Sequence, residues 1–221
     1  MTTYLFLKWA HIIALAYWLG GEWGVFNASR PVLNAQLSLE ERQRHMETVY
    51  RIDILPRTAI ILLLPLGLHM GALLNVQPLQ GPWIVGVWIL AAGWLSITLG
   101  AFLKHGTDLG ARLTKIDVSF HYVIIALLLI FGIYSVVTDW PFTAPWYAAK
   151  VALYGVALTI AMIVRIIMRS WADLFREIAA GSNPEAGARL HSQLTLGRGL
   201  ARFNWIVIVI VAYLGVAKPI F

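Results

Sequence analysis

The sequence contains no cysteine and few charged residues. Of its 221 residues, 13% are Asp, Glu, Lys or Arg, about half the share of roughly 25% in an ordinary soluble domain. The absence of cysteine excludes disulfides, thiolate-bound metals, iron–sulfur clusters and haem attached through Cys-x-x-Cys-His. A hydrophobic share of 59% exceeds what one soluble core could bury, so lipid must solvate the remainder.

Long apolar runs dominate the chain. A transmembrane helix needs about 20 mostly apolar residues, and the runs are too long and too continuous for the alternating strands of a membrane barrel. We therefore predict an all-α, polytopic membrane bundle of about six transmembrane helices, forming a single domain over residues 1–221. The predicted spans are 4–26, 58–76, 82–103, 118–137, 146–168 and 203–218.

The basic residues alternate between the connections. Lys and Arg follow the first, third and fifth spans, whereas the connections 77–81 and 138–145 contain neither. By the positive-inside rule the basic connections are cytoplasmic, and both termini are extracytoplasmic. The net charge of +6 then reflects topology rather than nucleic-acid binding. This pattern suits a multi-pass protein of a bacterial inner membrane.

The segment 169–202 is predicted to be cytoplasmic. It would continue the fifth helix over 170–180, break at 181–184 and form a short polar helix, because Ser182 and Asn183 before Pro184 resemble a helix start. In the third span, Gly86, Gly93 and Gly100 recur every seven residues. This small-residue stripe predicts close approach of another helix.

Three nitrogen-bearing side chains are predicted to lie at a similar depth in the membrane. His11 is seven residues past the start of the first span, and His69 is seven before the end of the second, each about 10 Å deep at 1.5 Å per residue. Lys150 is four residues into the fifth span, roughly 6 Å deep. Because ionisable groups inside a membrane are costly, their shared level predicts a functional site.

The neighbours of these residues suit a flat macrocycle. Trp18 shares a helical stripe with His11, and Tyr154 lies one turn from Lys150. Histidine is the commonest axial ligand of haem, so we predict a porphyrin pocket, with haem b as the cofactor. His11 and His69 together would suit electron transfer, whereas one ligand would leave a position open for catalysis. Interhelical hydrogen bonds and aromatic packing are the structural alternative for these residues.

Other readings remain open at this level. His121 opens the fourth span and could serve a second haem or quinone site, although an interfacial histidine often has no such role. A copper protein would need soft Met or Cys ligands, and Met70 alone adjoins a candidate histidine.

Four stretches resemble one membrane family. They are 7–21 (LKWAHIIALAYWLGG), 47–71 (ETVYRIDILPRTAIILLLPLGLHMG), 145–153 (PWYAAKVAL) and 202–219 (RFNWIVIVIVAYLGVAKP). The pattern is similar to the HemJ-type membrane protoporphyrinogen IX oxidases and the related CopD-type membrane proteins. The segment 82–137 looks like an inserted hairpin relative to the core helices, and His69 and Glu22 have no counterpart in the family pattern.

The resemblance implies a haem b protein that oxidises protoporphyrinogen IX and passes electrons to a quinone. The family's essential His and Lys would be His11 and Lys150, and Lys8 begins its Lys-x-x-His. Lys150 would be a ligand, a base or the partner of a propionate. The alternatives are an electron-transfer cytochrome b subunit of a larger respiratory complex, a CopD-like copper-handling protein, or a structural subunit without a cofactor. Partner membrane subunits or a homo-oligomer are compatible with each.

Overall fold

The chain folds as a bundle of long helices. The computed structural model describes residues 2–34, 36–181 and 183–219, and within these ranges it contains no strand. The all-helical part of the prediction is therefore confirmed. The elements are α1 (Thr2–Ala28), the 3₁₀ turn η1 (Pro31–Leu33), α2 (Leu39–Ile52), α3 (Ile54–Leu73), α4 (Pro82–Leu103), α5 (Asp108–Thr138), α6 (Pro145–Arg169), α7 (Trp171–Ala180) and α8 (Ala186–Ala217).

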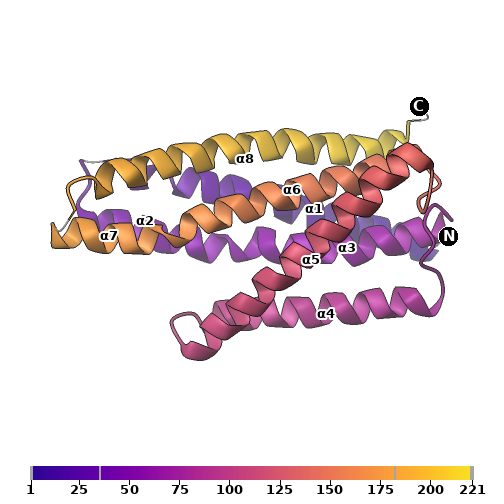
Figure 1. The fold of residues 1–221 in the computed structure, drawn as a ribbon, viewed down its shortest axis with the longest axis horizontal. Coiled ribbons are helices and arrows are strands. Elements are labelled where there is room, and N and C mark those ends of the chain that lie inside the picture. Colours follow the sequence, from indigo (N-terminus) through magenta and orange to yellow (C-terminus); the bar gives the residue numbers. More distant parts are fainter. Residues whose placement is uncertain (1, 35, 182, 220–221) are drawn as a thin grey trace.

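Most of the long helices run side by side, and α5 crosses them obliquely (Figure 1). The two chain ends lie at one end of the bundle, which we call the termini end. The short helices α2 and α7 lie at the opposite end, which we call the basic end. The connections 74–81 and 139–144 at the termini end contain no Lys or Arg, whereas Arg30 and Lys104 lie in connections at the basic end.

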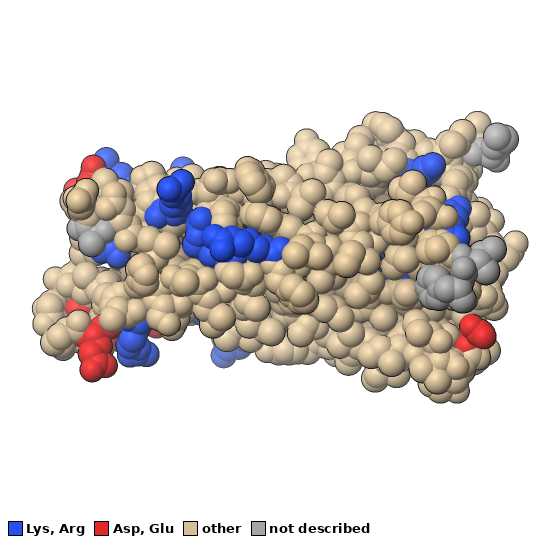
Figure 2. Space-filling view, turned by 90° about the horizontal axis from the view of Figure 1, so that it is seen from above, with Lys and Arg blue, Asp and Glu red and all other residues tan. Residues whose placement is uncertain are grey.

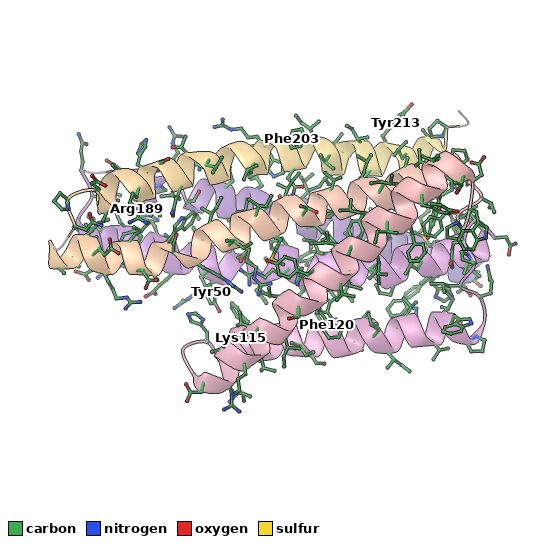
Figure 3. All side chains as sticks on the ribbon, in the orientation of Figure 1. Tyr50, Lys115, Phe120, Arg189, Phe203 and Tyr213 are labelled. Atoms are coloured by element: carbon green, nitrogen blue, oxygen red, sulfur yellow. The ribbon has the colours of Figure 1, made fainter. Side chains whose placement is uncertain are left out.

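Five helical stretches are long and apolar enough to cross a membrane. The predicted first span is not among them: α1 has 27 residues, but Lys8, His11 and Glu22 interrupt its apolar run. Large apolar side chains also point outward, and Figure 3 shows Phe203 and Tyr213 directed away from the bundle. Such an apolar exterior is the surface that a lipid-solvated bundle presents. The five stretches are Leu39–Leu73, Pro82–Leu103, Asp108–Thr138, Pro145–Ala180 and Ala186–Ala217.

Several helices extend beyond the predicted spans. The α5 helix begins at Asp108 rather than residue 118, and α8 begins at Ala186 rather than residue 203. Hydropathy marks where lipid contact starts, but helical hydrogen bonding continues into polar sequence. The predicted break at 181–184 corresponds to the link between α7 and α8, with Gly181 in the left-handed conformation. Ser182, part of the predicted helix start, lies outside the described residues.

The basic stretch before the second span forms a helix, although the sequence pattern suggested a loop. Ser38 begins α2 with a capping box, in which its hydroxyl accepts from the Glu41 N–H at 3.2 Å and its own N–H donates to the Glu41 carboxylate at 2.8 Å. This satisfies two donors that a helix start leaves free. A small apolar core at the basic end then joins α7 and α8 to the segment around α2. Its buried members are Val32, Trp171, Leu174, Phe175, Ala186, Leu190 and Leu194.

Glycine permits the closest approach of α5 and α6. A methyl group added at Gly132 would lie 2.5 Å from the backbone nitrogen of Ala152. The predicted stripe on α4 behaves differently. Nothing in the described chain lies within 4 Å of a methyl group at Gly86 or Gly93, and Gly100 meets one side chain of α5. The expectation that this stripe packs against another helix is therefore wrong for most of its length within the chain.

A buried ion pair links α4, α5 and α6. The Asp117 carboxylate, fully buried, lies 2.6 Å from Arg165 Nη2. Its other oxygen accepts hydrogen bonds from Trp94 Nε1 at 3.0 Å and Thr98 Oγ1 at 2.6 Å. The His121 ring lies beside it, with Nδ1 2.9 Å from the Asp117 main-chain oxygen. A charge removed from water needs this set of partners, so Asp117 holds three helices together.

The close contact at Gly132 predicts that Gly132→Ala lowers stability by about 1–3 kcal/mol, because the added methyl group forces α5 and α6 apart. Gly93→Ala is the matched control, since it has open space and alanine favours a helix by up to about 1 kcal/mol. Thermal unfolding in one detergent measures both. Equal melting temperatures for the two variants would show that the contact does not limit packing.

The ion pair predicts a second difference between matched variants. Asp117→Asn leaves the Arg165 guanidinium buried beside a neutral group, and should cost about 3–5 kcal/mol. Asp173→Asn removes the same charge from an exposed pair with Arg176, and should cost less than about 1 kcal/mol. Chemical or thermal unfolding of both variants provides the measurement. A melting temperature for Asp117→Asn as high as that of Asp173→Asn would contradict the proposed role of the pair.

Candidate functional site

A cavity of about 160 Å³ lies between α1, α3, α6 and α8 toward the termini end. It is many times larger than the roughly 10–15 Å³ that one water molecule needs. Its lining contains no Asp or Glu. We call it the termini-side cavity. Five of the predicted cofactor-binding residues line it together: Lys8, His11, Trp18, Lys150 and Tyr154.

His11 lines this cavity from α1. Its Nδ1 is buried and has no hydrogen-bond partner among the described residues. Across from it, α3 presents Gly67, where an added methyl group would lie 3.6 Å from His11 Cε1. A buried polar atom without a partner is uncommon and calls for a physical explanation. This imidazole is therefore available to a ligand or a metal ion.

Lys150 reaches the cavity from α6 and lies against the backbone of α8. A methyl group added at Gly215 would lie 2.5 Å from Lys150 Nζ, so the glycine makes room for the amine. No described carboxylate forms an ion pair with Lys150. Lys218 lies nearby, 5.5 Å from the Trp146 ring, and Lys8 is exposed at the edge. The cavity thus carries positive charge without a matching acid, which suits an anionic group.

The aromatic residues form a wall. The Trp18 ring is 1% exposed and meets the Tyr154 ring edge to face, with centroids 5.9 Å apart. Their polar atoms are already used, because Trp18 Nε1 donates to Glu22 at 2.8 Å and the Tyr154 hydroxyl donates to the Ile60 carbonyl at 2.6 Å. These rings therefore present apolar surface to a ligand, not hydrogen bonds.

Tyr147 belongs to this wall, and the sequence reasoning missed it. Its hydroxyl donates to the Gly67 carbonyl at 3.3 Å, and Gly71 leaves room for its ring. The signal was present, since residues three apart on a helix share a face and Tyr147 precedes Lys150 by three. The sequence pattern identified Tyr154, four positions from Lys150, but not Tyr147.

His69 does not face His11. Its Nδ1 accepts a hydrogen bond from Trp88 Nε1 of α4 at 3.2 Å, and it is absent from the cavity lining. Residues two apart lie about 200° apart around a helix, so when Gly67 faces the cavity, His69 faces away from it. The expected arrangement of His11 and His69 as opposite ligands of one iron is therefore not the one found.

A second cavity, of about 100 Å³, lies toward the basic end. We call it the basic-side cavity. His121, the candidate for a second site, lines it beside the Asp117–Arg165 pair. Glu22 lines it too and accepts from Asn204 Nδ2 at 3.1 Å, in addition to the bond from Trp18. Trp18 lines the termini-side cavity, so the Trp18–Glu22 bond stands between the two spaces.

The charged network of the basic-side cavity was not found from sequence. The predicted spans left Asp117 one residue outside the fourth span and Arg165 near the end of the fifth, and neither was proposed as a site residue. The spacing of Asp117 and His121, four residues apart on one helix face, was the available signal. Their pairing with Arg165 depends on how α5 crosses α6, which no sequence spacing shows.

The chemistry of the termini-side cavity follows from its atoms. One free imidazole nitrogen, one amine and an aromatic wall can hold a planar anionic ligand. Among the described residues, no group of three or more His, Cys, Asp or Glu could hold a metal ion. A porphyrin supplies four iron ligands itself, so that finding bears on a bare metal ion rather than on haem.

Comparison with known proteins leaves the family of this chain open. No family model, no curated protein and no solved structure matches it. The function therefore rests on the chain's own residues, in a multi-pass membrane protein whose apolar helices surround two mostly apolar cavities that contain ionisable side chains.

Proposed function

We propose that this chain is a haem b-binding membrane oxidoreductase similar to the HemJ-type protoporphyrinogen IX oxidases. One observation carries the proposal: His11, whose Nδ1 has no hydrogen-bond partner among the described residues, and Lys150 line one cavity that has no carboxylate in its lining. A neutral imidazole is a common iron ligand, and an amine pairs with a propionate. Bound haem b would supply the redox chemistry, accepting electrons from a porphyrinogen and passing them to a quinone.

His11 would be the axial ligand, and Lys150 and Lys8 would bind carboxylates at the edge of the macrocycle. Because Gly67 and Gly215 place no side chain against His11 and Lys150, both groups have room to contact a flat ligand. A cavity of about 160 Å³ is smaller than the roughly 300–1,000 Å³ of drug-sized pockets. A macrocycle would therefore extend outward between α1 and α8, where the exposed side chains of Ile12 and Val216 border the cavity.

The placement of His69 favours catalysis over electron transfer. With one imidazole in the cavity, His11 alone would hold an iron there, and a single protein ligand suits catalysis. A cytochrome b subunit of a respiratory complex would ordinarily use two such ligands. Trp18, Tyr147 and Tyr154 would exclude water from the face of the macrocycle.

A copper-handling protein is the second candidate. Met70 lines the termini-side cavity together with His11, and a thioether with an imidazole is a soft donor pair that suits Cu(I). This reading gives Lys150 no role, whereas haem gives it a carboxylate to bind.

We also propose that the protein lies in a bacterial inner membrane with both termini extracytoplasmic. The connections at the termini end lack Lys and Arg. In Figure 2 the largest visible group of Lys and Arg atoms lies in the half of the molecule toward the basic end. The positive-inside rule then places the basic end in the cytoplasm.

The ligand assignment predicts opposite results for two histidines. In detergent-purified protein, the dithionite-reduced spectrum should show a b-type haem that disappears in His11→Ala. It should remain in His69→Ala, because the His69 ring bonds Trp88 and does not line the cavity. Metal analysis accompanies the spectra. Haem lost from His69→Ala but kept by His11→Ala would refute the assignment, and bound copper without a haem spectrum would establish the second candidate. Oxidation of protoporphyrinogen IX with a quinone, followed by porphyrin fluorescence, tests the reaction.

The role of Lys150 predicts weaker porphyrin binding when its amine is removed or displaced. Lys150→Met should weaken binding by roughly tenfold or more, since a hydrogen bond to a charged group is worth about 1.5–3 kcal/mol. Gly215→Ala should act in the same direction, because the new methyl group occupies the place of the amine. Gly199→Ala is the control on the same helix, with nothing within 4 Å. Absorbance titration gives the affinities, and equal values for Gly215→Ala and Gly199→Ala would argue against this role.

A further inference from the structure

Two arginines lie over one aromatic ring at the basic end, and a third acts on one of them electrostatically. The guanidinium carbon of Arg198 lies 3.7 Å from the Phe26 ring centroid, and that of Arg202 lies 5.5 Å from it. Arg202 and Arg30 are the charged groups that act on Arg198 electrostatically. Among the described residues, none of the three forms an ion pair with a carboxylate. We call Arg30, Arg198 and Arg202 the arginine patch.

Arg198, the central residue of the patch, is held in place by hydrogen bonds and ring stacking. Arg198 Nη1 donates to Ser29 Oγ at 3.0 Å and to the main-chain oxygen of Phe26. Its ring stacking and these bonds fix the guanidinium, while its remaining N–H groups have no acceptor among the described residues. A fixed guanidinium presents paired donors that match the oxygens of a phosphate.

The patch lies where the sequence changes from polar to apolar. In α8 the stretch up to Arg202 contains three arginines, and the stretch from Phe203 to the helix end contains no charged residue. Arg30 lies in the turn that directly follows α1. The rings of Trp23 and Trp205 lie 4.9 Å apart beside the patch. Tryptophan at such a boundary is typical of the membrane interface, so the patch lies at the level of lipid headgroups.

We propose that the arginine patch binds the phosphodiester headgroup of an anionic phospholipid. Basic pockets between membrane helices bind such headgroups because the local positive charge is not balanced by protein acids. Phe26, Ser29 and Arg198 also line the basic-side cavity, whereas Arg30 and Arg202 lie outside its lining and are exposed. The site therefore runs from the membrane surface toward the bundle interior. It involves none of the residues proposed to hold haem.

The test compares lipids and matched arginine variants in the full-length protein. Native mass spectrometry and thermal unfolding would be recorded with phosphatidylglycerol, phosphatidylcholine and inorganic phosphate. We expect phosphatidylglycerol to remain bound and raise the melting temperature, and phosphatidylcholine to do so far less. Arg198→Gln and Arg202→Gln should each weaken phosphatidylglycerol binding roughly fivefold. Arg189→Gln, the same change near the start of α8 (Figure 3), should leave it within about twofold.

Other outcomes would overturn the proposal. Equal binding of phosphatidylglycerol and phosphatidylcholine would show that the lipid's net charge has no role. If Arg189→Gln weakens phosphatidylglycerol binding as much as Arg198→Gln does, the attraction comes from overall positive charge and not from the patch. If inorganic phosphate raises the melting temperature at concentrations where phosphatidylglycerol has no effect, the patch is a site for soluble phosphate. If Arg198→Gln does not fold, the double variant Arg30→Gln/Arg202→Gln decides the question, since both side chains are exposed.

Discussion

Glycines in neighbouring helices determine where polar side chains can enter this bundle. Lys150 lies against Gly215, His11 faces Gly67, and Tyr147 fills the space beside Gly71. In each case the partner helix offers bare backbone where a larger side chain would block the polar group. Inside a membrane, a polar group that cannot reach such a place must turn toward lipid at high cost. The termini-side cavity depends on these contacts.

The two cavities differ in how their charges are balanced. Glu22 and Asp53 line the basic-side cavity and Asp117 lies beside it, and Asp117 and Asp53 each pair with an arginine. Glu22 is held there by neutral donors, Trp18 and Asn204. The termini-side cavity has amines and an imidazole but no acid in its lining. Carboxylates that pair with arginines stabilise helix packing, although Arg165 Nη1 has no hydrogen-bond partner among the described residues. Amines without a nearby acid leave their positive charge for an anionic ligand. This contrast is the reason for proposing the cofactor at the termini end and a structural role for the Asp117 network.

The proposed lipid site and the proposed cofactor site lie toward opposite ends of the molecule. The arginine patch lies at the boundary between the polar and apolar parts of α8, and its charges would find their counterparts in headgroups. Lys8, Lys150 and Lys218 lie near the other end of the bundle, where both chain termini are found. Under these two proposals, basic residues at the two ends would serve different partners, although they add to the same net charge.

Composition and periodicity alone were sufficient to predict a helical membrane bundle, because long apolar runs have few other folds available in lipid. Depth along antiparallel helices also placed His11 and Lys150 on one level, and they do line one cavity. Depth carries no information on rotation about the helix axis, so His69 was expected opposite His11 although its ring points to Trp88. Hydropathy could not show α2 or the polar half of α8, since capping and helical hydrogen bonds continue where apolar residues stop. The pairing of Asp117 with Arg165 and the position of Gly215 beside Lys150 were decided by helix crossing, which depends on all the side chains that pack between the helices.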